Sequence, residues 1–300
     1  KRDYLKFLSK EKIFDQSAAT KIAHLRRIYI PLSFWIDKKY KKKGKTLFLG
    51  ISGGQGSGKT TVTGILKIIL KKYFKRKIHT SSIDDFYKTL EERDKISNTI
   101  HPLFKTRGVP GTHDTNLIKK FFDFIKKKKF RKFEAPRFDK SIDDRLKKKY
   151  WFNIKEKPEV VILEGWCVGA KAQSNKQLIK TINSQEKAKD QKMIWRKYVN
   201  DQLKNKYKKL FNQLNCLIYL KVKNFSLLQN WRLMQEKKLW LNSKNKKNLK
   251  IMSKGDVINF MQTYQRITQN MFKETPKYAS IILKLTSNHQ IKSMIYKKNY

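Results

Sequence analysis

One short segment constrains the fold of this 300-residue chain more than any other. Residues 53–60 read GGQGSGKT, which satisfies the pattern G-x-x-x-x-G-K-[ST]. A strand-like apolar run, Leu47–Ile51, precedes it, and a segment with helical spacing, Gly58–Phe74, follows it. In this context the glycines let backbone N–H groups converge on phosphate oxygens, and the helix presents its positive end to the same anion. The segment therefore predicts a nucleoside-triphosphate site rather than a chance glycine-rich turn.

The loop also assigns roles to its residues. We expect Lys59 to reach the β- and γ-phosphates and the Thr60 hydroxyl to ligate Mg²⁺, so that ATP and Mg²⁺ are the expected cofactors. This motif alone does not separate kinases from GTPases, motor ATPases or helicases. The residues expected to bind the nucleotide are Gly53, Gly54, Gln55, Gly56, Ser57, Gly58, Lys59, Thr60 and Thr61.

Strand-like and helix-like segments alternate along the chain. Five short apolar runs predict buried strands, and the longer stretches between them have helical spacing. Such alternation favours right-handed crossovers and a sheet covered on both faces. We therefore predict an α/β fold of the P-loop NTPase type, a three-layer sandwich whose five-stranded sheet is mainly parallel. The predicted strands are Leu47–Ile51, His79–Ile83, Val160–Leu163, Leu217–Val222 and Ser280–Leu285, and the predicted helices are Gly58–Phe74, Asn116–Lys129, Lys189–Leu214, Phe225–Leu241 and Asp256–Lys273.

The domain organisation is predicted to be simple. Residues 1–300 form one domain, in which residues 1–45 are a helical lead-in packed on the sheet. Asn242–Lys250 is rich in lysine and asparagine and is predicted to be a polar surface loop.

Carboxylates follow two of the predicted strands. Asp84 and Asp85 come at the end of the second, and Glu164 ends the third. Parallel sheets bind ligands at the carboxyl ends of their strands, where a carboxylate can accept a hydroxyl proton or hold Mg²⁺. Glu164 occupies the place of a Walker B acid. The plainer alternatives are a pair of helix-capping aspartates and an ordinary exposed glutamate.

Several further segments, taken in order, resemble the D-glycerate 3-kinase family, within the broader group of uridine kinase, pantothenate kinase and phosphoribulokinase. The similarity covers roughly residues 30–290, and its most specific parts are RGVPGTHD and EGWCVG. The segments are GISGGQGSGKT (50–60), SIDDFY (82–87), RGVPGTHD (107–114), PRFDKS (136–141), EGWCVG (164–169), WRLMQE (231–236) and FMQTYQR (260–266).

The resemblance implies transfer of the ATP γ-phosphoryl group to a hydroxyl of a small metabolite, glycerate being the first choice. It implies Asp84 as the general base, with Asp85 as its rival, and a catalytic role for Lys59. Glycerate is anionic, so an arginine fork near its carboxylate would suit it. The residues implied to bind the acceptor are Asp85, Tyr87, Arg107, His113, Asp114, Arg137 and Lys140, and those implied to hold the metal are Thr60 and Glu164.

Two parts of the resemblance carry alternatives. Residues of about 224–250 correspond to a lid, in which Arg232 would bridge the phosphates, although it could instead be a solvent-exposed arginine. His113 could merely stabilise a turn, and Arg137 could form a surface salt bridge.

After PRFDKS many relatives carry a glycine-rich stretch, whereas here Ile142–Arg145 follows directly. This departure weakens glycerate as the acceptor more than it weakens a kinase.

The net charge of +47 suggests a polyanionic partner, but its distribution does not. The three successive hundreds of residues carry +15, +15 and +17, and only 12 of the 71 basic residues are arginine. We therefore expect no specific nucleic-acid partner, and keep a nucleic-acid-binding NTPase as the alternative of another class.

Uridine, pantothenate or a sugar phosphate are the alternative acceptors. With no long apolar run and no secretory signal, neither a membrane nor an export route is expected, which favours the cytoplasm.

Overall fold

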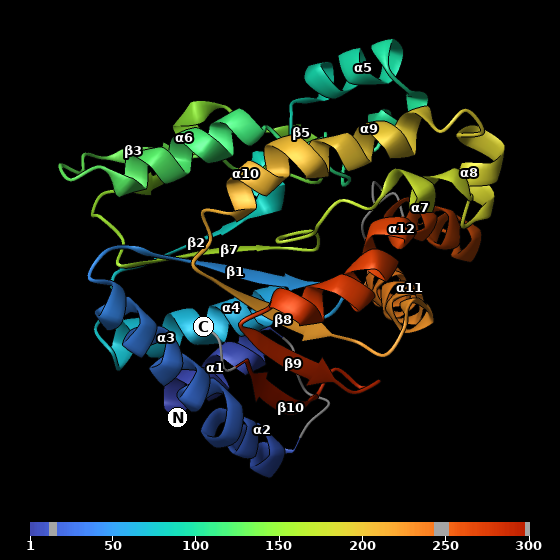
Figure 1. Cartoon of the computed structure of the whole chain (residues 1–300). Coiled ribbons are helices and arrows are strands. Elements are labelled where there is room, and N and C mark those ends of the chain that lie inside the picture. Colours follow the sequence, from blue (N-terminus) through green and yellow to red (C-terminus); the bar gives the residue numbers. More distant parts are fainter. Residues whose placement is uncertain (12–16, 243–251, 298–300) are drawn as a thin grey trace.

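A six-stranded sheet forms the centre of the computed structural model, which describes residues 1–11, 17–242 and 252–297. The strands lie in the order β10-β9-β8-β1-β7-β2, and every neighbouring pair is parallel except β9 with β10 (Figure 1). Their bounds are β1 Leu47–Gly53, β2 Ile78–Ser82, β7 Val160–Gly165, β8 Cys216–Lys221, β9 Ile281–Leu285 and β10 Ile291–Tyr296.

Alternation along the central strands divides the interior into two cores. In β1, Leu49 and Ile51 belong to one core, whereas Phe48 belongs to the other. In β7, Ile162 and Leu163 separate in the same way. Because successive strand side chains point to opposite faces, a strand that is apolar at every position needs helices on both sides. The sheet is covered accordingly.

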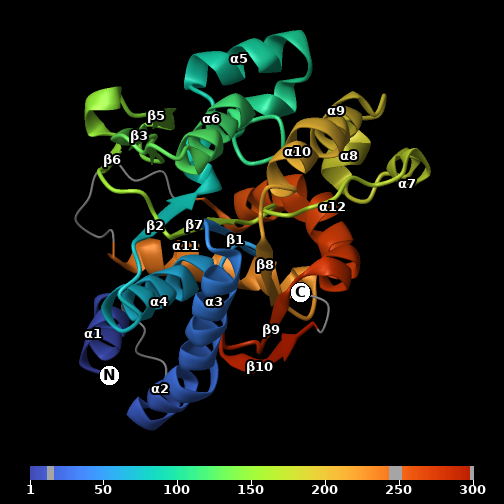
Figure 2. The same ribbon diagram turned by 60° about the vertical axis from the view of Figure 1, so that its left-hand side comes forward.

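The helices form two layers (Figure 2). The N-terminal helices and α4 (Lys59–Lys72) cover one face of the sheet. The other face is covered by α6 (Thr115–Lys126), by α12 (Lys254–Tyr278) and by the α9–α10 helix, which is the continuous helical segment of residues 194–211. The first layer comprises α1 Arg2–Lys10, α2 Ala18–His24, a π-helical turn Leu25–Tyr29, α3 Ile30–Lys43 and α4 Lys59–Lys72. The remaining helices are α5 Leu90–Thr99, α6 Thr115–Lys126, α7 Asn175–Ile179, α8 Ser184–Lys189, α9 Ile194–Gln202, the π-helical Leu203–Tyr207, α10 Lys208–Phe211, α11 Phe225–Asn242 and α12 Lys254–Tyr278.

Short elements complete the chain. They build a small outer lobe after α6, made of two hairpin-like pairs of strands. The pairs are β3 Phe133–Ala135 with β6 Phe152–Ile154 and β4 Phe138–Asp139 with β5 Asp144–Arg145, and the 3₁₀ turn Lys148–Tyr150 lies between β5 and β6. Two further 3₁₀ turns, Ile83–Phe86 and Pro102–Lys105, come before α6.

The predicted fold class is confirmed: the fold is an α/β sandwich with a mainly parallel sheet. All five predicted strands are present within one or two residues of their expected bounds. The antiparallel edge strand β10 was not predicted, because its sequence IKSMIY is only partly apolar and leaves most positions part-exposed. The predicted helix Lys189–Leu214 is broken near its start. Asp190 accepts the N–H groups of Trp195 and Arg196, so the chain turns there before α9 begins.

The N-terminal segment contains the helices α1 to α3, and its residues 12–16 lie outside the described part of the chain. The predicted loop Asn242–Lys250 and the end of the lid-like segment fall almost wholly outside it as well, since α11 is described to Asn242. Within the described residues no helix combines the length and the apolar character that crossing a membrane requires.

Candidate active site

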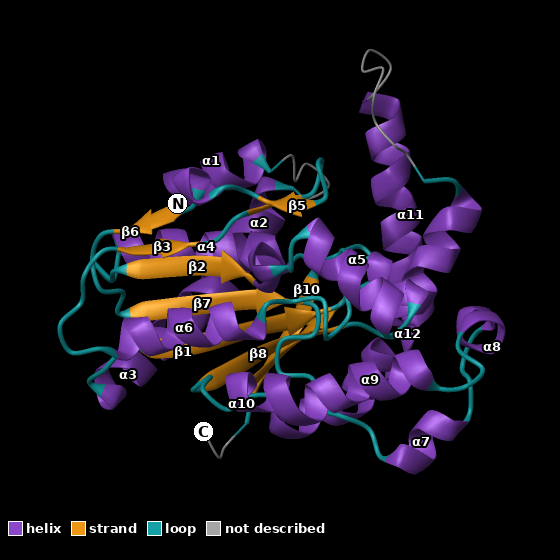
Figure 3. Ribbon diagram, turned by 90° about the horizontal axis from the view of Figure 1, so that it is seen from above, coloured by secondary structure: helices purple, strands orange, loops and turns teal. Residues whose placement is uncertain are grey.

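A cavity of about 930 Å³ opens where β1, β2 and β7 end. Figure 3 shows these three strands running toward α11 and α12, which close the same side. The register places Ile51 and Ser82 beside Glu164, so three strand ends meet at one level. We name this space the P-loop cavity. Its lining residues are Gln55, Gly56, Lys59, Thr60, Ser82, Asp84, Asp85, Tyr87, Lys105, Thr106, Arg107, Phe138, Lys140, Asp143, Glu164, Gly165, Trp166, Arg232, Gln235, Met252, Phe260 and Tyr264.

The glycine-rich loop connects β1 to α4 as the sequence predicts. Gly58 has a φ of +85°, in the left-handed region that glycine adopts without strain, and α4 begins at the next residue. Gly54 packs so closely on α11 that a Cβ atom there would lie 2.3 Å from the Leu228 side chain. The hydroxyl of Ser57 is buried and has no hydrogen-bond partner within the described residues. The loop therefore retains free polar groups in a tight backbone turn, as a phosphate cradle requires.

Lys59, Thr60 and Glu164 lie together at the base of the cavity. Lys59 Nζ donates to the carbonyl of Gly54 at 3.0 Å, and Thr60 Oγ1 donates to Glu164 Oε1 at 3.3 Å. Burial lowers the pKa of Lys59, and Glu164 opposes that effect; burial also raises the pKa of Glu164. The side chains thus hold a cation and a carboxylate in a site shielded from water.

The oxygens of Thr60 and Glu164 suit Mg²⁺, which prefers oxygen ligands and keeps several waters or phosphate oxygens. Among the described residues no group of three or more His, Cys, Asp or Glu side chains could hold a metal by itself. The hydroxyl and the carboxylate near the phosphate loop therefore fit a metal that arrives with a nucleotide. Bound there, it would neutralise phosphate charge.

Asp84 and Asp85 leave β2 in a 3₁₀ turn, and their carboxylates have different partners. Asp85 Oδ2 accepts the backbone N–H of Ser82 at 3.0 Å, as a capping aspartate does. Asp84 Oδ2 instead pairs with Lys140 Nζ at 2.8 Å in the cavity. Burial raises the pKa of Asp85 to about 6. Burial also acts on Asp84, but the neighbouring groups, Lys140 foremost, together outweigh it and hold the pKa of Asp84 below its ordinary value.

Tyr87 and His113 stand behind Asp84. The Tyr87 hydroxyl hydrogen-bonds to Asp84, and its ring stacks on His113 with centroids 4.4 Å apart. His113 is buried outside the lining of the cavity, where its Nδ1 lies 2.7 Å from the Tyr207 hydroxyl. Burial lowers the pKa of His113 to about 4, so its imidazole is neutral. His113 supports Tyr87 and does not reach the cavity.

Arg107 lines the cavity and lies beside the short connection Ile142–Arg145. It forms an ion pair with Asp143, a residue of that connection, which also pairs with Arg93. The Arg107 guanidinium lies 5.4 Å from the centroid of the Phe138 ring. The departure seen in the sequence therefore supplies an acid that holds Arg107 in place.

Arg232 reaches the cavity from α11. It forms an ion pair with Glu236, one helical turn further on, and lies 5.7 Å from the centroid of the Phe260 ring. Glu236 is buried and also accepts the N–H of Met252 at 3.2 Å. Arg232 is therefore neither free in solvent nor bonded to the phosphate loop in this state.

Eight of the predicted site residues lie outside the cavity lining: Gly53, Gly54, Ser57, Gly58, Thr61, His113, Asp114 and Arg137. Asp114 caps α6 by accepting the N–H of Leu117 at 2.9 Å, and it pairs with Arg145 at 3.4 Å. Arg137 stacks its guanidinium 4.7 Å from the centroid of the Phe152 ring. Thr61 follows Thr60 in the first turn of α4.

Other lining residues escaped sequence reasoning, although some lie in the segments that carried the resemblance. Trp166 Nε1 donates to the backbone carbonyl of Gly108 at 3.0 Å, and the Tyr264 hydroxyl donates to the backbone carbonyl of Arg107 at 3.1 Å. A Cβ atom on Gly108 would lie 2.2 Å from the Tyr264 hydroxyl, which explains the glycine after Arg107. Lys105 precedes this segment and shows no signal that distinguishes it from other lysines.

Comparison with known proteins agrees with this geometry. A fission-yeast protein named as an uncharacterized kinase, mug58, is 29% identical over 238 residues, covering 77% of this chain and 82% of that protein. The chloroplastic D-glycerate 3-kinase of Arabidopsis thaliana is 28% identical over 231 residues, which are 71% of this chain and 48% of that protein. The chain is a relative of D-glycerate 3-kinase. No protein-family model matches it.

Solved structures extend the likeness to nearly the whole chain. The D-glycerate 3-kinase of Cryptococcus neoformans superposes with a TM-score of 0.75 at 22% identity, covering 94% of this chain and all of that one. The YGR205w protein superposes with a TM-score of 0.69 at 27% identity, covering 93% and 98%. The fold is thus that of the Cryptococcus D-glycerate 3-kinase and of the YGR205w protein. With kinases among its sequence relatives, the chain is a P-loop kinase, a phosphotransferase that acts on an alcohol group.

Proposed function

We propose that this kinase transfers the γ-phosphoryl group of ATP to a hydroxyl of glycerate, with Mg²⁺ as the accompanying metal. The observation that carries the proposal is that the phosphate loop, Asp84 and the cations Lys105 and Arg107 line one cavity. A phosphate-binding loop, a carboxylate and two further cations around one cavity suit a small anionic alcohol. The similarity to D-glycerate 3-kinases supports this acceptor.

The chemistry assigned to the site is an in-line displacement. The acceptor hydroxyl gives its proton to the Asp84 carboxylate while its oxygen forms a bond to the γ-phosphorus. The bond from that phosphorus to the β–γ bridging oxygen breaks, and its electron pair leaves with ADP. Lys59 offsets the charge that develops on the phosphates, and Thr60 with Glu164 would hold Mg²⁺.

Asp84 is preferred to Asp85 as the base because geometry comes before pKa in assigning such roles. One Asp85 oxygen is engaged by the backbone N–H of Ser82, and a further backbone bond comes from Phe138. Within the described residues, the partners of the Asp84 carboxylate are the side chains of Lys140 and Tyr87. Its carboxylate can therefore rotate toward an acceptor without breaking the turn.

Arg107 and Arg232 take separate parts in the proposal. Arg107, held by Asp143, would bind the acceptor carboxylate. Arg232 lies on the lid-like segment and would exchange Glu236 for phosphate oxygens when the segment closes. The same proposal includes a cytoplasmic setting, supported by two free and buried cysteines, Cys167 and Cys216.

The test is an ATP-consumption screen with D-glycerate, uridine, pantothenate and ribulose 5-phosphate, followed by identification of the phosphorylated product. We expect turnover with D-glycerate. Arg107→Met should raise the KM for glycerate by about 100-fold, because a charged hydrogen-bond partner is lost, while the KM for ATP changes little.

Arg137→Met is the matched control, since Arg137 contacts the Phe152 ring and not the cavity. Its KM for glycerate should stay within about threefold of the unmodified enzyme. Turnover with another acceptor and none with glycerate would overturn the acceptor and leave the kinase chemistry standing. Equal effects of both arginine variants would remove Arg107 from the acceptor site.

A further inference from the structure

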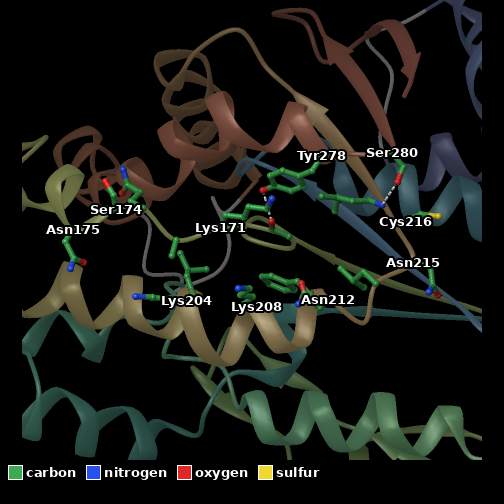
Figure 4. A pocket seen from close by; sticks show the side chains of 18 residues that line it. Lys171, Ser174, Asn175, Lys204, Lys208, Asn212, Asn215, Cys216, Tyr278 and Ser280 are labelled. Carbon is green, nitrogen blue, oxygen red and sulfur yellow. Dashed lines mark hydrogen bonds between the residues drawn. The ribbon is translucent and has the colours of Figure 1, made fainter. Parts of the chain in front are cut away.

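A second cavity, of about 840 Å³, shares no lining residue with the P-loop cavity. It lies between the α9–α10 helix, the segment Gly169–Asn175 after β7, and the end of α12, over the start of β8. We name it the lysine cavity. Figure 4 shows Lys204, Lys208 and Asn212 along one side and Lys171 with Tyr278 along the other.

Its charge is one-sided. Lys171, Lys204 and Lys208 line the cavity, and none of the described lining residues is Asp or Glu. Lys204 and Lys208 stand four residues apart and so share one face of their helix. Lys171 Nζ lies 3.9 Å from the centroid of the Tyr278 ring. Within the described part of the chain no carboxylate pairs with any of these three lysines, although the P-loop cavity pairs Lys140, Arg107 and Arg232 with acids.

The floor is apolar and its walls are fixed. Leu203, Phe211 and Leu217 supply aliphatic and aromatic surface. The Tyr278 hydroxyl donates to the carbonyl of Gly169 at 2.8 Å, which ties α12 to the segment after β7. Gly169 has a φ of +81°, and a Cβ atom there would lie 2.7 Å from the Leu217 side chain. The cavity is therefore formed before any ligand arrives, as small-molecule sites usually are.

We propose that the lysine cavity is a second ligand site, which binds an organic phosphate monoester with an apolar body. Three lysines act as point charges that suit a phosphate dianion, and no arginine fork is present among the lining residues to favour a planar carboxylate. The apolar floor requires a body that inorganic phosphate lacks. The volume falls in the range of metabolite-sized pockets. This site goes beyond the proposed phosphoryl transfer and does not depend on it.

The test uses 1-naphthyl phosphate as probe, in isothermal titration at low salt on the full chain carrying Lys59→Met. That change removes the cation of the phosphate loop and weakens anion binding there, and the charge reversals described next show whether the remaining binding is in the lysine cavity. We expect 1-naphthyl phosphate to bind at least about tenfold more tightly than either 1-naphthol or inorganic phosphate, because charge and apolar body both contribute. Tight binding of 1-naphthol would overturn the anionic character of the site.

Charge reversal then locates the site. The double variant Lys204→Glu, Lys208→Glu should raise the dissociation constant of 1-naphthyl phosphate by at least about 30-fold. Lys206 lies on the same helix but outside the lining, so Lys206→Glu should change that constant by less than about threefold. The neutral double variant Lys204→Gln, Lys208→Gln removes the positive charge without adding negative charge. Circular dichroism of each variant shows whether the protein is still folded, so a loss of binding through lost charge is distinguished from one through unfolding. Unchanged binding in the reversed double variant, or no binding by the parent, overturns the proposal. These titrations measure binding and not turnover, so their outcome does not depend on whether the protein phosphorylates glycerate.

Discussion

The P-loop cavity and the lysine cavity have similar volumes and opposite electrostatic organisation. In the first, Lys140, Arg107 and Arg232 each lie against a carboxylate, so the charges hold one another in place. In the second, three lysines face an apolar floor without any acid among the described lining residues. A site that moves protons and phosphoryl groups needs both signs of charge in fixed positions. A site that only binds an anion needs one sign.

The largest effect should come from Asp84, the acid proposed as the general base. Asp84→Asn keeps the size of the side chain but removes the proton acceptor, so we expect kcat to fall by about 1,000-fold. Binding of ATP should change by no more than about threefold, because Asp84 is not part of the phosphate loop. Steady-state kinetics and nucleotide titration measure the two quantities.

The matched variant is Asp85→Asn, whose asparagine oxygen can still accept the N–H of Ser82. Its kcat should fall by less than about tenfold. If Asp85→Asn were the more damaging change, the base would be Asp85. In either case 1-naphthyl phosphate should bind the lysine cavity equally well, and a loss of that binding would show that the two cavities are coupled.

An intermediate effect should appear in stability rather than turnover. Burial raises the pKa of Asp85 to about 6, above the ordinary value of 3.8. In the unfolded chain this acid ionises from about pH 4 upward, whereas in the folded chain it stays protonated to about pH 6. The free energy of unfolding therefore falls as pH rises through this window. Asparagine does not ionise, so the Asp85→Asn variant does not lose stability in this way. Its free energy of unfolding should exceed that of the parent by about 1–2 kcal/mol at pH 8 and should equal it near pH 4.

Asp139→Asn is the control of opposite sign. The Ser141 hydroxyl and backbone N–H hold the pKa of the exposed Asp139 below its ordinary value, so its carboxylate favours the folded state above about pH 4. That variant should lose a little stability at pH 8 and none at low pH. Thermal or urea unfolding across pH measures both variants. A stability change in Asp85→Asn that is the same at pH 4 and pH 8 would contradict the assigned burial.

The sequence predicted the parts of the molecule that depend on local pattern. The apolar runs located the five parallel strands, and the glycine-rich motif located Lys59 and Thr60 because its spacing fixes the backbone. The parallel sheet then brought Asp84 and Glu164 to the same edge, as expected for acids at strand ends.

What escaped prediction depends on contacts between distant segments. Arg107 meets Asp143 across 36 residues, and His113 lies behind Tyr87 rather than in the cavity. Arg137 turns to Phe152, which no spacing rule indicates. The lysine cavity was hidden for another reason: a net charge of +47 spread evenly along the chain gives Lys204 and Lys208 no contrast with their neighbours.

The smallest effect should come from Lys171, and it measures how strongly the lysine cavity depends on each cation. Its ammonium already lies over the Tyr278 ring, an interaction of about 0.5–1 kcal/mol at exposed sites, so part of its charge is satisfied before a ligand binds. Lys171→Met should therefore weaken the binding of 1-naphthyl phosphate only about threefold, which is less than the effect of reversing the charges of Lys204 and Lys208. Lys206→Met is the neutral control and should leave the dissociation constant unchanged. If Lys171→Met abolished binding, the anion would sit against the segment after β7 rather than against the helix. The ligand would then lie close to Gly169, the last of the six residues Glu164–Gly169 that lead from the P-loop cavity to the lysine cavity.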